Sequence, residues 1–244
     1  MPYNIGLDRG HGGADPGAVK FVKEVDVATI LTKQLEAMLQ ADDNYVPVII
    51  CPYEKGLGIM ERAAQANKQK LDLLISNHFN AGGGNGWEVY PEVPRKIGHP
   101  RYTIHQKSLA FAQKLAELTS DIQQLRGDRG IQYKYADKDA YFGVIRLVNS
   151  PAVLVESAFV DNQADISDFD SPQGLLRLAG RQYAAICSFF GTTPLFDKEG
   201  RKIGEPLEPV RPKYRVFTEK ASFDTMEKAV ECHKTAGGII ICGE

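Results

Sequence analysis

Short apolar runs alternate with longer amphipathic stretches along the first 190 residues of the chain. The runs are rich in Val, Ile and Leu and too short for helices, whereas the stretches between them repeat apolar residues at three- and four-residue steps. Strands separated by helices favour a parallel sheet. The chain is therefore predicted to form an α/β fold, with a single twisted, mostly parallel sheet and helices on both faces. Strands are expected near 5–7, 46–51, 71–76, 87–90 and 152–156, short extended pieces near 132 and 143–147, and helices over about 24–40, 59–70, 102–124 and 173–190.

Composition and charge are those of an ordinary globular protein. The 244 residues are 43% hydrophobic and 25% charged, and the net charge is −2. This balance predicts no nucleic-acid partner, and no stretch approaches the roughly 20 apolar residues that span a bilayer, so no membrane insertion is expected. We also expect no secretory signal, because Met1 leads directly into a strand. The four cysteines lack C-x-x-C spacing and are expected to be buried, reduced thiols.

The composition changes after Gly191, where prolines and mixed charges follow one another. We therefore expect a main domain over residues 1–191, a Pro-rich linker over 192–212 and a small α/β unit over 213–244.

The last segment is predicted to be a βαβ-like appendage, with strands at 214–217 and 238–242 and a helix at 224–234. About thirty residues rarely hold a core unaided. The unit is thus expected to dock on the main domain, to form a homo-oligomer with a copy from another chain, or to be partly disordered.

A glycine-rich loop follows the first predicted strand, over Asp8–Ala18. It holds His11 close to the backbone with open space beside it, which suits contact with a metal, a phosphate or a substrate. Such a loop is a weak signal alone, and partners elsewhere in the chain are needed to interpret it.

Three polar residues share one predicted place in the fold. His11 follows the first strand, His78 follows the strand at 71–76, and Glu156 closes the strand at 152–156. If these strands are parallel neighbours, all three emerge at the carboxyl edge of one sheet, where α/β folds place their sites. Glu24 begins the helix after the His11 loop and can return to the same edge. Two imidazoles and a carboxylate can hold zinc, and a second carboxylate can move a proton in amide hydrolysis.

Structural alternatives exist for three of these residues. His11 could be a backbone-bonded turn residue, His78 could bond an asparagine in its own turn, and Glu24 could merely favour the helix start. Glu156 differs, because a carboxylate that ends an apolar run is costly to bury unless it is paired or functional.

Five stretches resemble, in order and over essentially residues 3–191, the zinc-dependent N-acetylmuramoyl-L-alanine amidases of the amidase-3 type. They are Asp8–Ala18, Lys23–Val27, Leu74–Ala81, Gly86–Tyr90 and Pro151–Asn162. The resemblance implies that His11, Glu24 and His78 bind Zn²⁺ and that Glu156 is the catalytic acid/base. It further implies a peptidoglycan substrate, cleaved between N-acetylmuramic acid and L-alanine.

The chain departs from the family pattern at Arg9, where proline is usual, at Asn77 and at Ser157-Ala158. Arg9 could contact an anionic substrate group or could simply replace a turn-forming proline. Further groove candidates, equally open to a surface or packing role, are Arg126, Arg129, Tyr133, Tyr135 and Tyr141, with Trp87 either core or groove wall. No ligand role is expected for His99, His105 or His233.

A wall hydrolase without an export signal fits a bacteriophage endolysin used for host cell lysis, with a mother-cell lysin as second choice. It would stay in the host cytoplasm until released to the wall. The C-terminal unit weakly resembles half of a SPOR-type repeat, which implies a wall-binding or oligomerising module. Two alternatives remain: a zinc amidohydrolase or peptidase acting on another amide, and a non-catalytic wall-binding module.

Overall fold

The computed structural model describes residues 1–93, 95–127, 129–133 and 142–204, and the backbone of three short strands between 214 and 243. The chain divides into two compact units, Met1–Ile203 and Gly204–Glu244.

The first unit is built on a five-stranded sheet with the strand order β2-β1-β3-β5-β4. Its strands are β1 (Tyr3–Arg9), β2 (Tyr45–Ile49), β3 (Leu73–Asn80), β4 (Glu88–Pro91) and β5 (Ala152–Phe159). Neighbouring strands are parallel except β4, which pairs antiparallel with β5 at the edge. The predicted single, mostly parallel sheet is confirmed.

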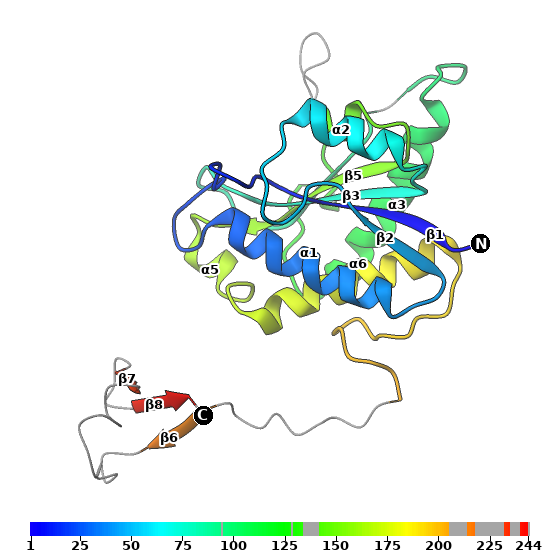
Figure 1. The fold of residues 1–244 in the computed structure, drawn as a ribbon. Coiled ribbons are helices and arrows are strands. Elements are labelled where there is room, and N and C mark those ends of the chain that lie inside the picture. Colours follow the sequence, from blue (N-terminus) through cyan, green and yellow to red (C-terminus); the bar gives the residue numbers. More distant parts are fainter. Residues whose placement is uncertain are drawn as a thin grey trace. The chain divides into compact units, whose positions relative to one another are not determined.

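Helices cover both faces of this sheet (Figure 1). One face carries α1 (Glu24–Gln40), α3 (Tyr102–Thr119) and α6 (Pro172–Phe190), and the other carries α2 (Ile59–Lys68) and the single turn α4 (Gly143–Arg146). A further turn, α5 (Gln163–Ile166), follows β5.

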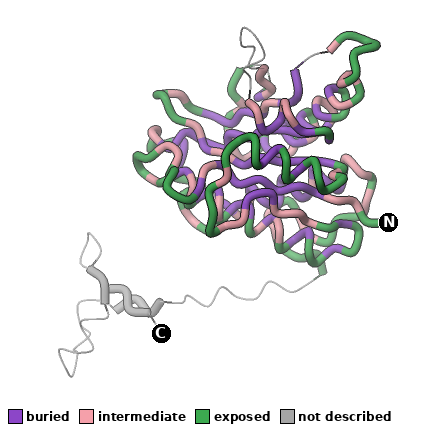
Figure 2. The backbone as a smooth tube through the Cα atoms, turned by 45° about the horizontal axis from the view of Figure 1, so that its top comes forward, coloured by how far each residue is buried: buried purple, intermediate pink, exposed green. Residues whose placement is uncertain are grey.

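Alternate residues of β5 enter the two cores. Val153 and Val155 join the cluster under α1, α3 and α6, whereas Ala152 and Leu154 join the cluster under α2 and α4. Burial on both faces explains why the central strands read as continuous apolar runs. Figure 2 shows these strands as buried tube within a more exposed shell.

Four local expectations differ from the structure. β3 continues through His78 to Asn80, and β5 continues past Glu156 to Phe159, because the two strands go on pairing beyond their apolar segments. The piece at 143–147 is helical over Gly143–Arg146 rather than extended, because five residues are too few to reveal a period. Near 132 the described residues make an isolated bridge, between Val89 and Ile131, in place of a strand.

Residues 192–203 belong to the first unit rather than standing clear of it. α6 ends at Gly191 with a left-handed backbone, and the Leu195 N–H then donates to the Tyr183 hydroxyl at 2.9 Å. Cys51 and Cys187 are buried free thiols, as expected. Among the described helices, none has the length and apolar character needed to cross a bilayer.

The second unit contains β6 (Tyr214–Phe217), β7 (Cys232–Lys234) and β8 (Ile240–Gly243), all antiparallel in the order β6-β8-β7. Strands were expected at two of these places. The expected helix at 224–234 lies outside the described residues except for its last three, which form β7. The role of this unit remains a prediction.

Candidate metal centre

His11 lies in the loop after β1 and has a left-handed backbone, with φ 61°. Its Nδ1 is 2.8 Å from Asp15 Oδ2, and its Nε2 is 3.1 Å from Glu24 Oε2. A carboxylate on Nδ1 fixes the proton there and directs the Nε2 lone pair to the other side. Asp15 therefore orients His11 for a ligand role. Asp15 was not among the predicted site residues, although its four-residue spacing from His11 was a usable signal.

Glu24 is the first residue of α1 and joins the two histidines. Its side chain is buried, and Oε1 is 2.9 Å from His78 Nδ1. Backbone N–H groups hold both of its oxygens, that of Phe79 donating to Oε1 and that of Ala18 to Oε2. The carboxylate is thus fixed between the loop after β1 and the end of β3.

Two glycines of the loop leave room for the ligand side chains. A Cβ at Gly17 would lie 2.5 Å from Glu24 Oε2, and a Cβ at Gly10 would lie 2.5 Å from His78 Cε1. Neither distance is tolerable, so these glycines are required by the close approach of the cluster. The two glycines of this loop therefore leave the space that the side chains of Glu24 and His78 occupy.

The three predicted ligands lie together. One ligand atom from each of His11, Glu24 and His78 lies within 4.8 Å of the others, and among the described residues these form the group that could hold a metal ion. Ligands about 2.0–2.2 Å from a tetrahedral zinc lie ~3.4 Å apart, so small side-chain movements suffice. A His₂Glu set with an open fourth position is one that catalytic zinc accepts.

The three residues of the cluster shift one another's pKa values. The hydrogen bond to Glu24 raises the pKa of His11 to about 9. Burial opposes ionisation of Glu24, but its bonds to His11 and His78 outweigh burial and hold the pKa of Glu24 far below its ordinary value. Burial also opposes the charge on His78, yet Glu24 leaves the pKa of His78 raised. In the metal-free protein, His11 is therefore protonated at neutral pH, and its positive charge offsets the negative charge of Glu24.

Glu156 lies beside this cluster. It is the register partner of His78 on the neighbouring strand, and its Oε2 is buried without a hydrogen-bond partner. Burial raises the pKa of Glu156 to about 7, and the negative charges of Glu24 and Glu88 act in the same direction. A carboxyl group with a pKa near neutrality can both accept and return a proton.

Glu88 is a buried carboxylate that the sequence analysis did not single out. It faces Glu156 in the β4–β5 register, and its oxygens accept from Asn80 Nδ2 and the Tyr90 hydroxyl and pair with Arg126 at 3.1 Å. The cost of burying a carboxylate in an apolar strand, used for Glu156, would have identified it too.

A cavity of about 280 Å³ opens next to the two histidines. Its polar lining consists of His11, His78, Asp8, Asp15 and Arg62. Ile59 and Phe142 belong to an apolar side contributed by the α2 and α4 segments. The cavity is the space on this face into which a substrate could approach the cluster.

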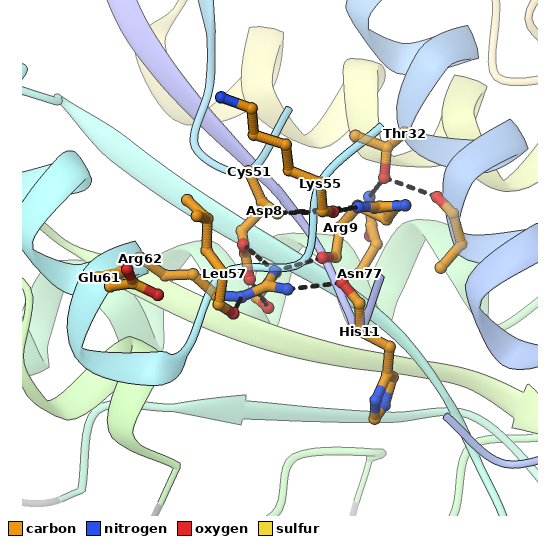
Figure 3. A network of polar contacts seen from close by, with 12 residues as sticks. Asp8, Arg9, His11, Thr32, Cys51, Lys55, Leu57, Glu61, Arg62 and Asn77 are labelled. Atoms are coloured by element: carbon orange, nitrogen blue, oxygen red, sulfur yellow. Dashed lines mark hydrogen bonds and ion pairs between the residues drawn. The ribbon is translucent and has the colours of Figure 1, made fainter. Parts of the chain in front are cut away.

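Arg9 is buried and faces the loop after β2. Its guanidinium donates to the carbonyl oxygens of Lys55 at 2.7 Å, Tyr53 at 3.1 Å and Pro52 at 3.4 Å. These bonds tie the end of β1 to the loop that follows β2 (Figure 3). The geometry therefore favours a structural role for Arg9 over contact with substrate.

The remaining candidates lie elsewhere or serve the fold. Trp87 is fully buried and belongs to the core, and Arg126 stacks over Phe159, 5.0 Å from its ring centre. His105 bonds the Glu92 carbonyl, and His99 accepts from the Arg101 N–H. Tyr135 and Tyr141 lie outside the described residues, and of His233 only the backbone in β7 is described.

Fold and cluster together define an α/β protein with a candidate mononuclear metal centre at the carboxyl end of a parallel sheet. The chain belongs to the N-acetylmuramoyl-L-alanine amidase family, amidase-3 type, whose profile matches residues 5–188. The family resemblance read from the sequence is confirmed.

Curated relatives include an endolysin of Bacillus phage SPP1, 31% identical over 67% of this chain and 57% of its own length. The amidase CwlM of Bacillus licheniformis is 31% identical over 68% of this chain and 60% of its own. The chain thus spans little more than half the length of these relatives.

Solved structures share the fold. The N-acetylmuramoyl-L-alanine amidase from Clostridium difficile 630 has a TM-score of 0.65 at 23% identity, covering 79% of this chain and 98% of that one. The catalytic domain of the CD27L endolysin has a TM-score of 0.58 at 22% identity, covering 78% of this chain and 98% of that one.

Proposed function

We propose that this chain is a zinc-dependent N-acetylmuramoyl-L-alanine amidase that cleaves the amide between N-acetylmuramic acid and the L-alanine of the stem peptide. The observation that carries the proposal is the partnerless Oε2 of Glu156 beside the His11–Glu24–His78 cluster. Membership of the amidase family supports the choice of bond.

His11, Glu24 and His78 would hold the ion. When bound, zinc supplies Lewis-acid polarisation of a carbonyl oxygen and makes a neighbouring water more acidic. Asp15 keeps the proton of His11 on Nδ1, so that Nε2 is available. Glu156 accepts a proton at Oε2 from the attacking water and returns it to the alanine nitrogen as the C–N bond breaks.

A Glu156→Gln variant tests the role of this carboxylate. It keeps the side chain's size, so the variant should bind zinc and unfold at the wild-type temperature, while wall hydrolysis falls on the order of 10²–10⁴-fold. Turbidity loss of purified walls, zinc content and thermal unfolding are measured together. Residual activity close to wild type would contradict the assignment.

The reaction products separate the amidase from the alternatives. Cleavage at the proposed bond releases peptides with a free L-alanine amino group and leaves glycan strands whose N-acetylmuramic acid residues carry free lactyl carboxyl groups. Another new amino terminus would indicate an amidohydrolase or peptidase of different specificity. A non-catalytic wall-binding module would release neither product, and its wall binding would survive a chelator.

The biological setting proposed is lysis of a host cell from within, supported by the phage endolysin among the relatives. The enzyme would remain in the host cytoplasm until a partner opens the membrane, with peptidoglycan as its substrate. Residues 213–244 would then bind wall or bring copies of the chain together.

A further inference from the structure

Arg62 on α2 is a buried arginine whose two terminal nitrogens bond to the end of β1 and to the loop that carries His11. Its Nε donates to the Leu57 carbonyl at 2.8 Å, and its Nη1 pairs with Asp8 Oδ1 at 2.7 Å. Nη1 also donates to the Arg9 carbonyl, and Nη2 donates to the carbonyl of His11 (Figure 3). The planar guanidinium group of Arg62 therefore holds the carbonyl groups of Arg9 and His11, on both sides of Gly10.

His11 needs such fixing more than an ordinary residue does. Its backbone lies in the left-handed region, which L-amino acids with a side chain rarely adopt. Such conformations persist where the surroundings hold them in place. The bond from Arg62 reaches His11 itself, through its carbonyl oxygen, while Asp15 and Glu24 hold the ring.

The same network reaches the strand of the other histidine. Asp8 uses Oδ1 for Arg62 and Oδ2 for the Ser76 hydroxyl, at 2.6 Å. Ser76 precedes His78 by two residues on β3, and both side chains point to the same face of the sheet. Arg62 is thus connected to one ligand directly and to the other through Asp8 and Ser76.

We propose that Arg62 is a positioning residue for the metal centre, which holds the His11 loop so that the ligands are arranged before a cation arrives. Arg62 contributes no ligand atom; it acts through the His11 carbonyl and through Asp8. The inference rests on the metal role proposed above for His11, Glu24 and His78. An arrangement made in advance lowers the cost of binding, because fewer groups must be ordered when the ion enters.

The test compares Arg62→Lys with Arg181→Lys in the full chain, using Zn²⁺ alone as probe. Lysine keeps the charge but loses the fork that reaches two places at once. Arg181 is a matched control: it is also buried, on α6, and pairs with Glu199 at 2.8 Å and with Asp121 at 3.3 Å, away from the cluster. Zinc affinity is measured by competition with a chromogenic chelator, and the unfolding temperature is measured on the metal-free proteins.

Arg62→Lys is expected to weaken zinc binding about tenfold or more. Arg181→Lys should lower the unfolding temperature while leaving zinc affinity as in wild type. The inference is overturned if Arg62→Lys binds zinc as wild type does, or if both variants lose affinity in proportion to lost stability. If the wild type itself binds no zinc at the cluster, the proposed function fails first.

A second variant decides the matter if Arg62→Lys does not fold. Ser76→Ala removes one hydroxyl and leaves Arg62 and both histidines in place. Loss of its bond to Asp8 should weaken zinc binding about threefold, since one link of the network is released. Wild-type affinity in Ser76→Ala would then overturn the inference.

Discussion

At the scale of single side chains, protonated His11 pairs with the Glu24 carboxylate in the metal-free protein, and a metal ion must displace that proton in order to bind. The pKa of His11 is raised to about 9 by its bond to Glu24, so His11 is protonated at neutral pH without metal. We therefore expect zinc affinity to rise with pH up to about 9 and then to level off. Chelator competition between pH 6 and 10 measures this, and a flat profile would contradict it.

The stability of the metal-free protein should change in the opposite sense. A histidine whose pKa rises on folding contributes stability that is complete below its unfolded value of 6.5 and is lost as pH rises to about 9. The unfolding temperature of chelator-treated protein should fall across this window. Zinc-loaded protein is the control, because histidines that bind the metal are already neutral and do not titrate in this window.

Gly17 gives a second prediction at the residue scale. Gly17→Ala places a methyl group against Glu24 and His11, at a backbone φ of 67°. Gly191→Ala is the matched control, with φ 72° and open space around the new Cβ. Both should lower the free energy of unfolding by about 1–2 kcal/mol through backbone strain, and only Gly17→Ala should lose zinc binding. Equal zinc affinity in both variants would refute the view that Gly17 is needed to leave space for Glu24 and His11.

Residue types and their places after strands made the cluster a candidate, and the family resemblance implied the role of each member. His11, His78 and Glu156 each follow or end an apolar run, and Glu24 starts the next helix, so parallel neighbouring strands would bring them to one edge of the sheet, as they do here. Arg62 and Glu88 were not predicted. Their roles depend on contacts across 54 residues, as between Arg62 and Asp8, or across a strand pair, and periodicity carries no information on either.

At the scale of elements, the antiparallel edge strand β4 places one carboxylate opposite another. The charge of Glu88 contributes to raising the pKa of Glu156. Glu88→Gln removes that charge and leaves Arg126 unneutralised beside the site, and both changes lower the pKa of Glu156. The acidic limb of the kcat/KM profile for wall hydrolysis should therefore move to lower pH.

Glu92→Gln is the control for that experiment. Glu92 is equally buried and is held by Arg101 at 2.8 Å and Arg95 at 3.1 Å, just beyond β4. Its substitution should lower the unfolding temperature but leave the pH midpoint unchanged. An unmoved midpoint in Glu88→Gln would show that β4 does not tune the acid/base group.

The types of the five strands of the main sheet and of its four long helices followed from period and composition, whereas the ends of β3 and β5 and the type of α4 did not. β3 and β5 extend past their apolar segments because pairing between them continues over His78 and Glu156. Polar residues kept inside a strand look like loop residues in the sequence. The helix α4 was not predicted because it is a single turn of four residues, which is too short to show a helical repeat in the sequence.

At the scale of the whole molecule, the division at Ile203 predicts that the two units are separable. A chain of residues 1–203 should keep the zinc affinity and unfolding temperature of the full chain, because the sheet, both cores and all four site residues lie within it. If residues 213–244 bind wall, sedimentation with purified walls should decrease. Unchanged wall binding would exclude that role.

The strand order has a consequence for the growing chain. β5 is the last strand of the main sheet to be synthesised, yet it lies between β3 and β4, which are both made earlier. His11, Glu24 and His78 are therefore all synthesised before the strand that joins β3 to β4, and β4 acquires its partner strand only when β5 has been made. The last strand of the sheet is thus also the one that brings Glu156 to the proposed metal centre.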